Sequence, residues 1–279
     1  MTNSIETTIT RADAKSLPAA LQKLPEWKET YKGKKPAVFL DYDGCLTPIV
    51  KNPEDAILSP EMKKVLQELA EVCFVAVVSG RDRANVANLV QLDNLYYAGS
   101  HGFDITGPNH LKTEPGGAAA ALPALDKAEK TLQEKLRKVP GSLVERKKYA
   151  IAVHFRNVAE EQVELVEQAV DETLAQHETL KKGLGKKVFE LKPNLDWHKG
   201  KAVLWLLNEL GMERPDILPI YIGDDITDED AFASLRNRGL GILVGEHDQL
   251  TAAEYRLESV DEVKDFLSAL KAFCAEAGN

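Results

Sequence analysis

Two aspartates one residue apart, Asp41 and Asp43, directly follow an apolar run in the stretch AVFLDYDGCLTP, residues 37–48. Acidic side chains are rarely buried unless they are paired or bind a cation. A second pair, Asp224 and Asp225, follows another apolar run in ILPIYIGDD. Clustered carboxylates with no histidine or cysteine pattern around them are the ligands that Mg²⁺ prefers. The sequence therefore predicts a Mg²⁺ site with oxygen ligands.

Such a site favours phosphoryl transfer. A carboxylate that attacks a phosphate dianion meets a repulsion of about 4 kcal/mol per charge pair at ~4 Å and an effective dielectric of ~20. Mg²⁺ would offset part of this, and Lys199 in WHKGKAVLWLL would offset more. Ser79 follows a third apolar run, in VVSGR. One aspartate of the first pair can attack phosphorus, while the other can protonate the leaving oxygen and later activate water. Gly44 lets the chain turn tightly beside them.

The elements that must position these residues are predicted from the apolar pattern. Buried strands are expected in five runs: PAVFL (36–40), VCFVAVVSG (72–80), NLYYAGSHG (94–102), ILPIYIGDD (217–225) and LGILVG (240–245). Helices are expected over 17–31, 58–70, 81–90, 199–211, 227–239 and 261–274, with Ser59 and Thr227 as N-caps. Alternating strands and helices predict an α/β domain with a parallel sheet, whose ligands bind beyond the carboxyl ends of the strands.

A segment with a different sequence pattern interrupts this alternation of strands and helices. Residues 108–193 hold a polar helix ending near Val139, the alternating runs SLVERKK and YAIAVHF, an amphipathic helix over 159–177 and a last strand, KKVFELKP. We therefore predict an α/β core over 32–107 and 194–279, an inserted α+β domain over 108–193, and an N-terminal extension with a helix over 1–31.

Composition limits the partners. The chain has 279 residues, with 35 Lys and Arg against 44 Asp and Glu, and a formal charge of −9. This balance argues against nucleic acid and anionic membranes, but not against a small anionic substrate at a local cation. The three cysteines form no C-x-x-C pair, and no run approaches the roughly 20 apolar residues of a membrane span. A cytoplasmic protein is expected, with a monomer favoured.

Four motifs carry a resemblance to a known family. In chain order, DYDGCLTP, VVSGR, KGKA and GDDITDE resemble the four motifs of the haloacid dehalogenase-like (HAD) phosphatases. LDYDGCLTPIV, SHGFDI, VERKKYAIAVHFR and GDDITDEDAF are similar to the trehalose-6-phosphate phosphatase family, from about Pro36 to Val244. The resemblance implies a Rossmann-like HAD core with a C2-type cap over the site, and hydrolysis of trehalose 6-phosphate through a phosphoaspartyl intermediate. A trehalose-6-phosphate synthase is a candidate partner.

The resemblance also implies roles for single residues. Asp41 would be the nucleophile and Asp43 the general acid and base. The phosphate would be bound by Ser79, Gly80 and Lys199. The Mg²⁺ ligands would be Asp41, the main-chain carbonyl of Asp43 and Asp224, supported by Asp225 and Asp228. Cys45 stands where the family usually has threonine, and we interpret it as a packing residue.

Recognition of the sugar is expected in the inserted domain. Glu145 and Lys147 lie at i and i+2 of a predicted strand, so both point to one face, and Glu190 lies on another strand. The resemblance assigns these three residues to the trehalose moiety. Arg81 and His101 are further candidates for substrate binding, although His101 could equally order its own loop. For His154, which alternates away from the apolar face, a structural hydrogen bond is favoured.

Other functions stay open at this point. Another sugar phosphatase, for instance one acting on sucrose phosphate, would use the same core, as would a phosphomutase. A phospho-accepting signalling module also combines Mg²⁺, acidic residues and a lysine. It needs neither Asp43 nor an insertion over 108–193, and lids of this kind exclude water and select substrates. An enzyme is therefore favoured.

Overall fold

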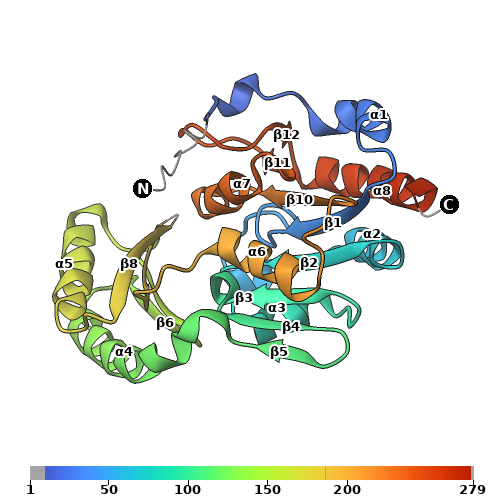
Figure 1. Ribbon diagram of the computed structural model, residues 1–279. Helices are drawn as coiled ribbons and strands as arrows, with labels where there is room; N and C mark the ends of the chain where they lie inside the picture. The colour runs from blue at the N-terminus through green and yellow to red at the C-terminus, as the bar shows by residue number, and fades with distance from the viewer. Residues whose placement is uncertain (1–9, 186, 278–279) are drawn as a thin grey trace, which may run out of the picture.

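The chain forms two sheets that lie side by side (Figure 1). The computed structural model describes residues 10–185 and 187–277, so residues 1–9 of the predicted N-terminal extension lie outside it. The larger sheet has eight strands in the order β12-β11-β10-β1-β2-β3-β4-β5, and the smaller has four in the order β6-β7-β9-β8. The larger sheet is parallel from β12 to β3, and β4 and β5 continue it as antiparallel strands. This confirms the predicted α/β core with an added α+β unit.

Apolar runs form the central strands of the larger sheet because both of its faces are covered. Its strands are β1 (Lys35–Leu40), β2 (Phe74–Val78), β3 (Tyr96–Gly99), β4 (Asp104–Gly107), β5 (Leu111–Thr113), β10 (Ile217–Gly223), β11 (Leu240–Val244) and β12 (Tyr255–Leu257). Along β1, Val38 and Leu40 pack into one core cluster, while Ala37 and Phe39 pack into the other.

Helices provide the two covering layers. The layer over Val38 and Leu40 comprises α1 (Ala20–Thr30), α2 (Pro60–Ala70), α3 (Arg83–Val90) and α8 (Val260–Ala277). The layer over Ala37 and Phe39 comprises α6 (Lys199–Glu209) and α7 (Glu229–Leu235). No helix within the described residues is long and apolar enough to cross a bilayer.

Two predicted helix starts had different outcomes. Ser59 caps α2 as expected, since its hydroxyl accepts a hydrogen bond from the Met62 N–H at 3.1 Å. The prediction of Thr227 as an N-cap was wrong. Asp225 caps a short 3₁₀ turn at Ile226–Asp228 through a reciprocal capping box with Asp228, and α7 begins only after that turn. The two carboxylates satisfy the free N–H groups better than a single hydroxyl would.

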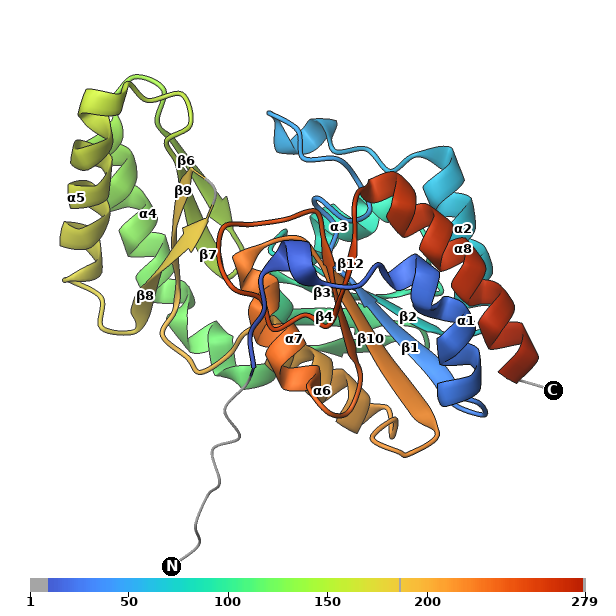
Figure 2. The same ribbon diagram turned by 90° about the horizontal axis from the view of Figure 1, so that it is seen from above.

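The smaller sheet and its helices form a cap beside the larger sheet. The sheet consists of β6 (Leu143–Lys147), β7 (Ala150–His154), β8 (Leu180–Gly185) and β9 (Val188–Pro193), and the helices are α4 (Leu122–Leu136) and α5 (Val163–Leu174). Figure 2 shows both helices on the outer face of this sheet, away from the larger sheet. Ile151, Val153 and Leu191 pack against these helices in a core of their own. The opposite face of the sheet is therefore turned toward the carboxyl ends of β1 and β10.

Four strands were not predicted: β4, β5, β8 and the short edge strand β12. The residues of β8, LKKGLG, have no clear apolar alternation because Lys182, on the face toward the helices, pairs with Glu167 and Asp171 of α5. The hairpin of β4 and β5 extends the larger sheet, although the predicted insertion began at residue 108. Leu111–Thr113 therefore belong with the larger sheet rather than with the cap.

Candidate active site

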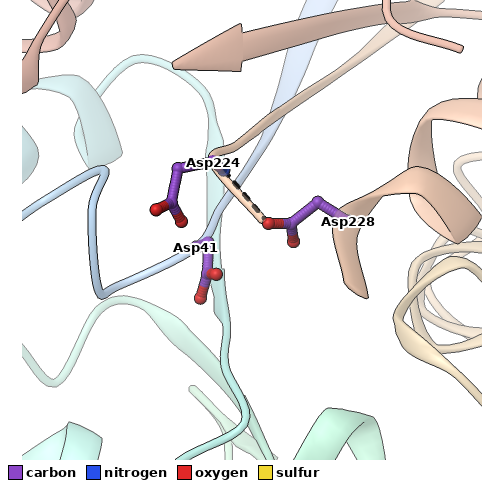
Figure 3. Close-up of side chains that lie close together, drawn as sticks. All are labelled: Asp41, Asp224 and Asp228. Atoms are coloured by element: carbon purple, nitrogen blue, oxygen red, sulfur yellow. Dashed lines mark hydrogen bonds between the residues drawn. The ribbon is translucent and has the colours of Figure 1, made fainter. Parts of the chain in front are cut away.

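The topology brings the two acidic motifs together. β1 and β10 are parallel neighbours, and Asp41 and Asp224 come directly after their last paired residues. One carboxylate oxygen each of Asp41, Asp224 and Asp228 lies within 4.8 Å of the others (Figure 3). β2 pairs with the other side of β1, and Ser79 follows it at the same edge. The site thus lies beyond the carboxyl ends of three adjacent parallel strands, as the sequence predicted.

Lys199 lies inside this acidic group. Its Nζ donates to Asp41 Oδ2 and to Asp228 Oδ1, both at 2.7 Å, and the lysine side chain is only 2% exposed. Burial alone would lower the pKa of Lys199, but the carboxylates of Asp228 and Asp41 outweigh it and raise the pKa. The lysine is therefore a permanent cation between two buried carboxylates.

One lysine does not balance the acidic residues. Burial raises the pKa of Asp41 well above its usual value, against the opposing effect of Lys199. Burial, with the nearby charge of Asp228, raises the pKa of Asp224 to about 7. Negative charge held this close and this deep is unfavourable without further positive charge. The group has the electrostatics of a site made for a divalent cation.

The hydrogen bonds show which oxygens are free for a metal. Asp228 accepts hydrogen bonds from Lys199, from the Tyr221 hydroxyl at 2.6 Å, and from the N–H groups of Asp224 and Asp225 at 3.1 and 3.0 Å. These four donors use the acceptor capacity of one carboxylate. By contrast, no residue in the described part of the chain donates a hydrogen bond to the Asp224 side chain. Asp224 thus has free oxygens of the kind that Mg²⁺ binds, whereas Asp228 orders the loop and the lysine.

Gly44 is required by the approach of this loop to the first motif. Its φ is +77°, and a Cβ atom there would lie 2.0 Å from Asp224 Oδ2. Any other residue would displace the carboxylate. The neighbouring Cys45 is fully buried, and burial raises the pKa of its thiol well above the usual value, so it stays protonated as a packing group.

Asp43 is engaged by an arginine. Arg81 donates from Nε and Nη2 to the two Asp43 carboxylate oxygens, both at 2.7 Å, and from Nη2 to the Pro53 carbonyl at 2.8 Å. The main-chain N–H of Arg81 also donates to Ser79 Oγ at 3.1 Å. The structure thus places Arg81, predicted as a substrate ligand, on the predicted general acid and base. Asp225 lies apart from the three-carboxylate group, and its side chain caps a backbone N–H at Ile226.

The cap brings its own charged residues to this edge. Lys147 Nζ lies 3.4 Å from Glu190 Oε1 and 3.5 Å from the Gly80 carbonyl oxygen. His101 Nε2 lies 3.1 Å from Glu190 Oε2. Burial would raise the pKa of Glu190, but His101 and Lys147 hold it below its usual range. Lys147 therefore meets the loop that follows β2, and Glu190 meets His101 just after β3.

Glu145 lies on the same face of the cap sheet, as predicted from its spacing to Lys147. In the strand register, Glu145 is opposite Ala152, and Ala152 is opposite Glu190. His154 Nε2 lies 2.7 Å from Glu145 Oε2, which fits the favoured structural hydrogen bond for this histidine. The two acidic residues thus stand on either side of an alanine.

Sequence reasoning missed two contributors. Tyr221 looked like one more apolar residue of its strand, yet its hydroxyl holds Asp228. Asp82 lies just after the Ser79 motif, and nothing in the sequence around it indicated a role. Its carboxylate accepts a hydrogen bond from the Lys148 N–H of the cap. Both roles depend on which segment packs against the side chain, and the apolar periodicity of a sequence does not indicate this.

Comparisons with known proteins agree with this geometry. A family model described as trehalose-phosphatase matches residues 39–261. The chain is 45% identical over 268 residues to a trehalose 6-phosphate phosphatase of Zea mays, covering 91% of this chain and 74% of that protein. It is 42% identical over 265 residues to a trehalose-phosphate phosphatase of Mycobacterium bovis, covering 94% and 67%. The solved C-terminal domain of C. albicans trehalose-6-phosphate phosphatase aligns with a TM-score of 0.77 at 26% identity, covering 92% of this chain and 99% of that one.

Proposed function

Because this chain belongs to the trehalose-phosphatase family, we propose that it hydrolyses trehalose 6-phosphate to trehalose and phosphate through a phosphoaspartyl intermediate. One observation carries the proposal. Lys199 bridges Asp41 and Asp228 at 2.7 Å, while the Asp224 carboxylate next to them accepts no hydrogen bond from the described residues. This arrangement orients a nucleophile beside one cation and leaves a carboxylate free for a metal ion, which would supply the further positive charge that an incoming phosphate needs.

Asp41 would carry out the first step. Its Oδ1 accepts a hydrogen bond from the Tyr42 N–H and its Oδ2 from Lys199, both at 2.7 Å, so the carboxylate is fixed before substrate arrives. Attack forms an Asp41–phosphorus bond and breaks the bond to the sugar oxygen, which leaves with a proton from Asp43. Water activated by Asp43 then cleaves the phosphoaspartate. Ser79, Gly80 and Lys199 would hold the phosphate throughout.

The ion pair between Asp43 and Arg81 has to open during this cycle. With both carboxylate oxygens bound by the guanidinium, Asp43 has no proton to give to a leaving group. A phosphate dianion is an equally good partner for a planar guanidinium. We therefore propose that the substrate phosphate competes for Arg81 and releases Asp43 as it binds.

The donor set fits Mg²⁺. Asp41, the carbonyl of Asp43 and Asp224 would hold it, with Asp225 and Asp228 ordering the loop around them. When bound, Mg²⁺ supplies charge that offsets the repulsion between the phosphate and the carboxylates.

Chelation is therefore expected to stop the reaction. EDTA should abolish phosphate release, and added Mg²⁺ should restore it. Mg²⁺ should also raise the melting temperature of the wild-type protein, because binding to the folded state alone stabilises it. In Asp224→Asn this rise should be lost or much reduced. Activity that is indifferent to EDTA, or an equal rise in both proteins, would contradict the assignment of the metal site.

The cap is proposed to recognise the sugar. Glu145, Lys147 and Glu190 face the core from one side of the cap sheet, and small residues lie in the same rows: Ala152 between the two glutamates, and Gly183 opposite Glu190. Small side chains between charged ones leave room for a ligand, and the charged groups can bind its hydroxyls. The core alone would accept many phosphate esters.

Truncation of these cap residues should separate the two classes of substrate. A buried hydrogen bond to a hydroxyl is worth about 1–3 kcal/mol when its partner is left unpaired. Glu145→Ala, Lys147→Ala and Glu190→Ala should each lower kcat/KM for trehalose 6-phosphate roughly tenfold or more. Hydrolysis of 4-nitrophenyl phosphate should change much less, because it carries no sugar to be recognised.

Glu167→Ala is the matched control, since Glu167 pairs with Lys182 on the helix side of the same sheet. It should behave as wild type with both substrates. Wild-type activity of all three cap variants on the sugar phosphate would contradict recognition by the cap. A phosphate-release screen over sugar phosphates, with sucrose 6-phosphate included and products identified, separates the proposed activity from a sucrose phosphatase and from a phosphomutase.

A further inference from the structure

Asp82 is a helix N-cap residue that does not cap its helix. It directly precedes α3, where an aspartate normally accepts hydrogen bonds from the first turn, but its side chain makes no such bond. Its oxygens instead accept hydrogen bonds from the main-chain N–H of Lys148, at 2.9 and 3.1 Å, and Oδ1 accepts one from the Ser100 hydroxyl at 3.0 Å. A residue of the core thus gives up a local bond for a contact with the cap.

The contact lies at the turn between β6 and β7. Lys147 is the last residue of β6, and its Nζ lies near the Gly80 carbonyl and Glu190, so the residue beside the contact faces the site. Because Asp82 binds the main-chain N–H of Lys148, this contact depends on where the hairpin backbone lies and not on which side chain residue 148 carries. The Lys148 ammonium reaches other carboxylates, Asp104 at 3.3 Å and Glu114 at 2.6 Å.

We propose that Asp82 is a positioning residue for substrate recognition, which docks the β6–β7 hairpin on the loop after β2 and thereby places Lys147 and Glu190 over the phosphate site. This inference rests on the proposed function of the cap residues. Asp82, Arg81 and Gly80 are consecutive, so one short segment contacts the hairpin, Asp43 and the Lys147 side chain. The loop after β2 therefore both contacts the cap and forms part of the proposed phosphate site.

Three substitutions separate docking from capping. Asp82→Ala removes the contact with the hairpin and leaves no side chain that could cap α3. Asp82→Ser supplies a hydroxyl that could cap α3, but this hydroxyl is too short to reach the hairpin. Asp82→Asn keeps one carbonyl oxygen that can accept a hydrogen bond from the Lys148 N–H. If Asp82 docks the hairpin, Ala and Ser should both lower kcat/KM for trehalose 6-phosphate about tenfold, and Asn should recover part of the loss. The loss with 4-nitrophenyl phosphate should stay within about twofold.

Hydrogen–deuterium exchange of the hairpin amides tests docking without any substrate. Residues 147–150 should exchange faster in the Ala and Ser variants than in wild type, with the Asn variant between them. The matched control is Asp126→Ala, because Asp126 contacts the same hairpin at Arg146 from within the cap, at 3.0 Å. It should change neither the exchange of residues 147–150 nor kcat/KM for trehalose 6-phosphate.

The possible outcomes decide between the roles. Wild-type kinetics and exchange in Asp82→Ala would overturn the proposal, as would recovery by Ser, which would show that only the helix cap matters. An equal loss with both substrates would also overturn it, because it would indicate damage to the core. Faster exchange without a change in sugar phosphate hydrolysis would overturn the recognition role. If Lys147→Ala also left that hydrolysis unchanged, the proposed function of the cap would fail with it.

Discussion

Asp41→Asn is expected to abolish turnover, with kcat lowered by roughly three orders of magnitude or more, as for other catalytic nucleophiles. Asparagine has nearly the same shape as aspartate, but an amide is a poor nucleophile toward phosphorus. Lys199 and the Tyr42 N–H both donate to this side chain, and only one of them can find an oxygen on the amide. The chemistry is therefore lost even if the site keeps its geometry.

The same substitution should not weaken the fold. Burial raises the pKa of Asp41 well above its usual value, so at neutral pH the ionised group makes folding less favourable than a neutral one would. Lys199 keeps Asp228 as a partner, and removal of the buried charge offsets the lost hydrogen bond, so the melting temperature of Asp41→Asn should stay close to that of wild type. This pairing of lost activity with retained stability distinguishes a nucleophile from a structural carboxylate.

Phosphate release and thermal unfolding of the variant provide the measurement, and mass spectrometry must exclude deamidation back to aspartate. Asp216→Asn is the control, because Asp216 pairs with Arg214 on the surface, at the opposite end of β10 from Asp224. It should match wild type in both assays. Substantial activity of Asp41→Asn with residue 41 confirmed as asparagine would remove the proposed covalent mechanism.

The core of the site could be predicted because each part of it marks a strand end. Apolar runs that stop at Asp41, Ser79 and Asp224 identify parallel strands, and the carboxyl ends of parallel strands share one edge. Their adjacency in space, β10-β1-β2, then followed from the fold. Lys199 could be included because positive charge was needed and the lysine begins a helix.

The pairing of side chains could not be predicted from the same pattern. Arg81 binding to Asp43, and Asp82 binding to the Lys148 N–H, depend on how a loop and the cap pack against the core. Periodicity identifies the buried face of an element but not the element that lies opposite. The edge strand β8 was missed for a related reason, because Lys182 holds a helix-facing position by pairing with acidic residues of α5.

Lys199→Met should be the most damaging single change to the fold of this site. Methionine has a similar length but leaves Asp41 and Asp228 buried without the cation that now lies 2.7 Å from each. Breaking a buried ion pair by removing one partner costs about 3–5 kcal/mol of unfolding free energy. We also expect kcat to fall by roughly three orders of magnitude, because the nucleophile loses its orientation and the phosphate loses a positive partner.

The pH dependence of stability checks the cause of that loss. Lys199 now lowers the pKa of Asp41 against the effect of burial, so its removal should raise this pKa further. The ionised form of a buried Asp41 is the destabilising one and protonation removes this penalty, so the difference in unfolding free energy between variant and wild type should shrink as the pH falls through the raised pKa of Asp41. Urea denaturation at several pH values measures this difference. Lys201→Met is the control on the same helix, since Lys201 is partly exposed and, among the described residues, its ammonium pairs only with Asp196. If Lys199→Met were as stable and as active as Lys201→Met, the buried lysine would hold neither the nucleophile nor the loop.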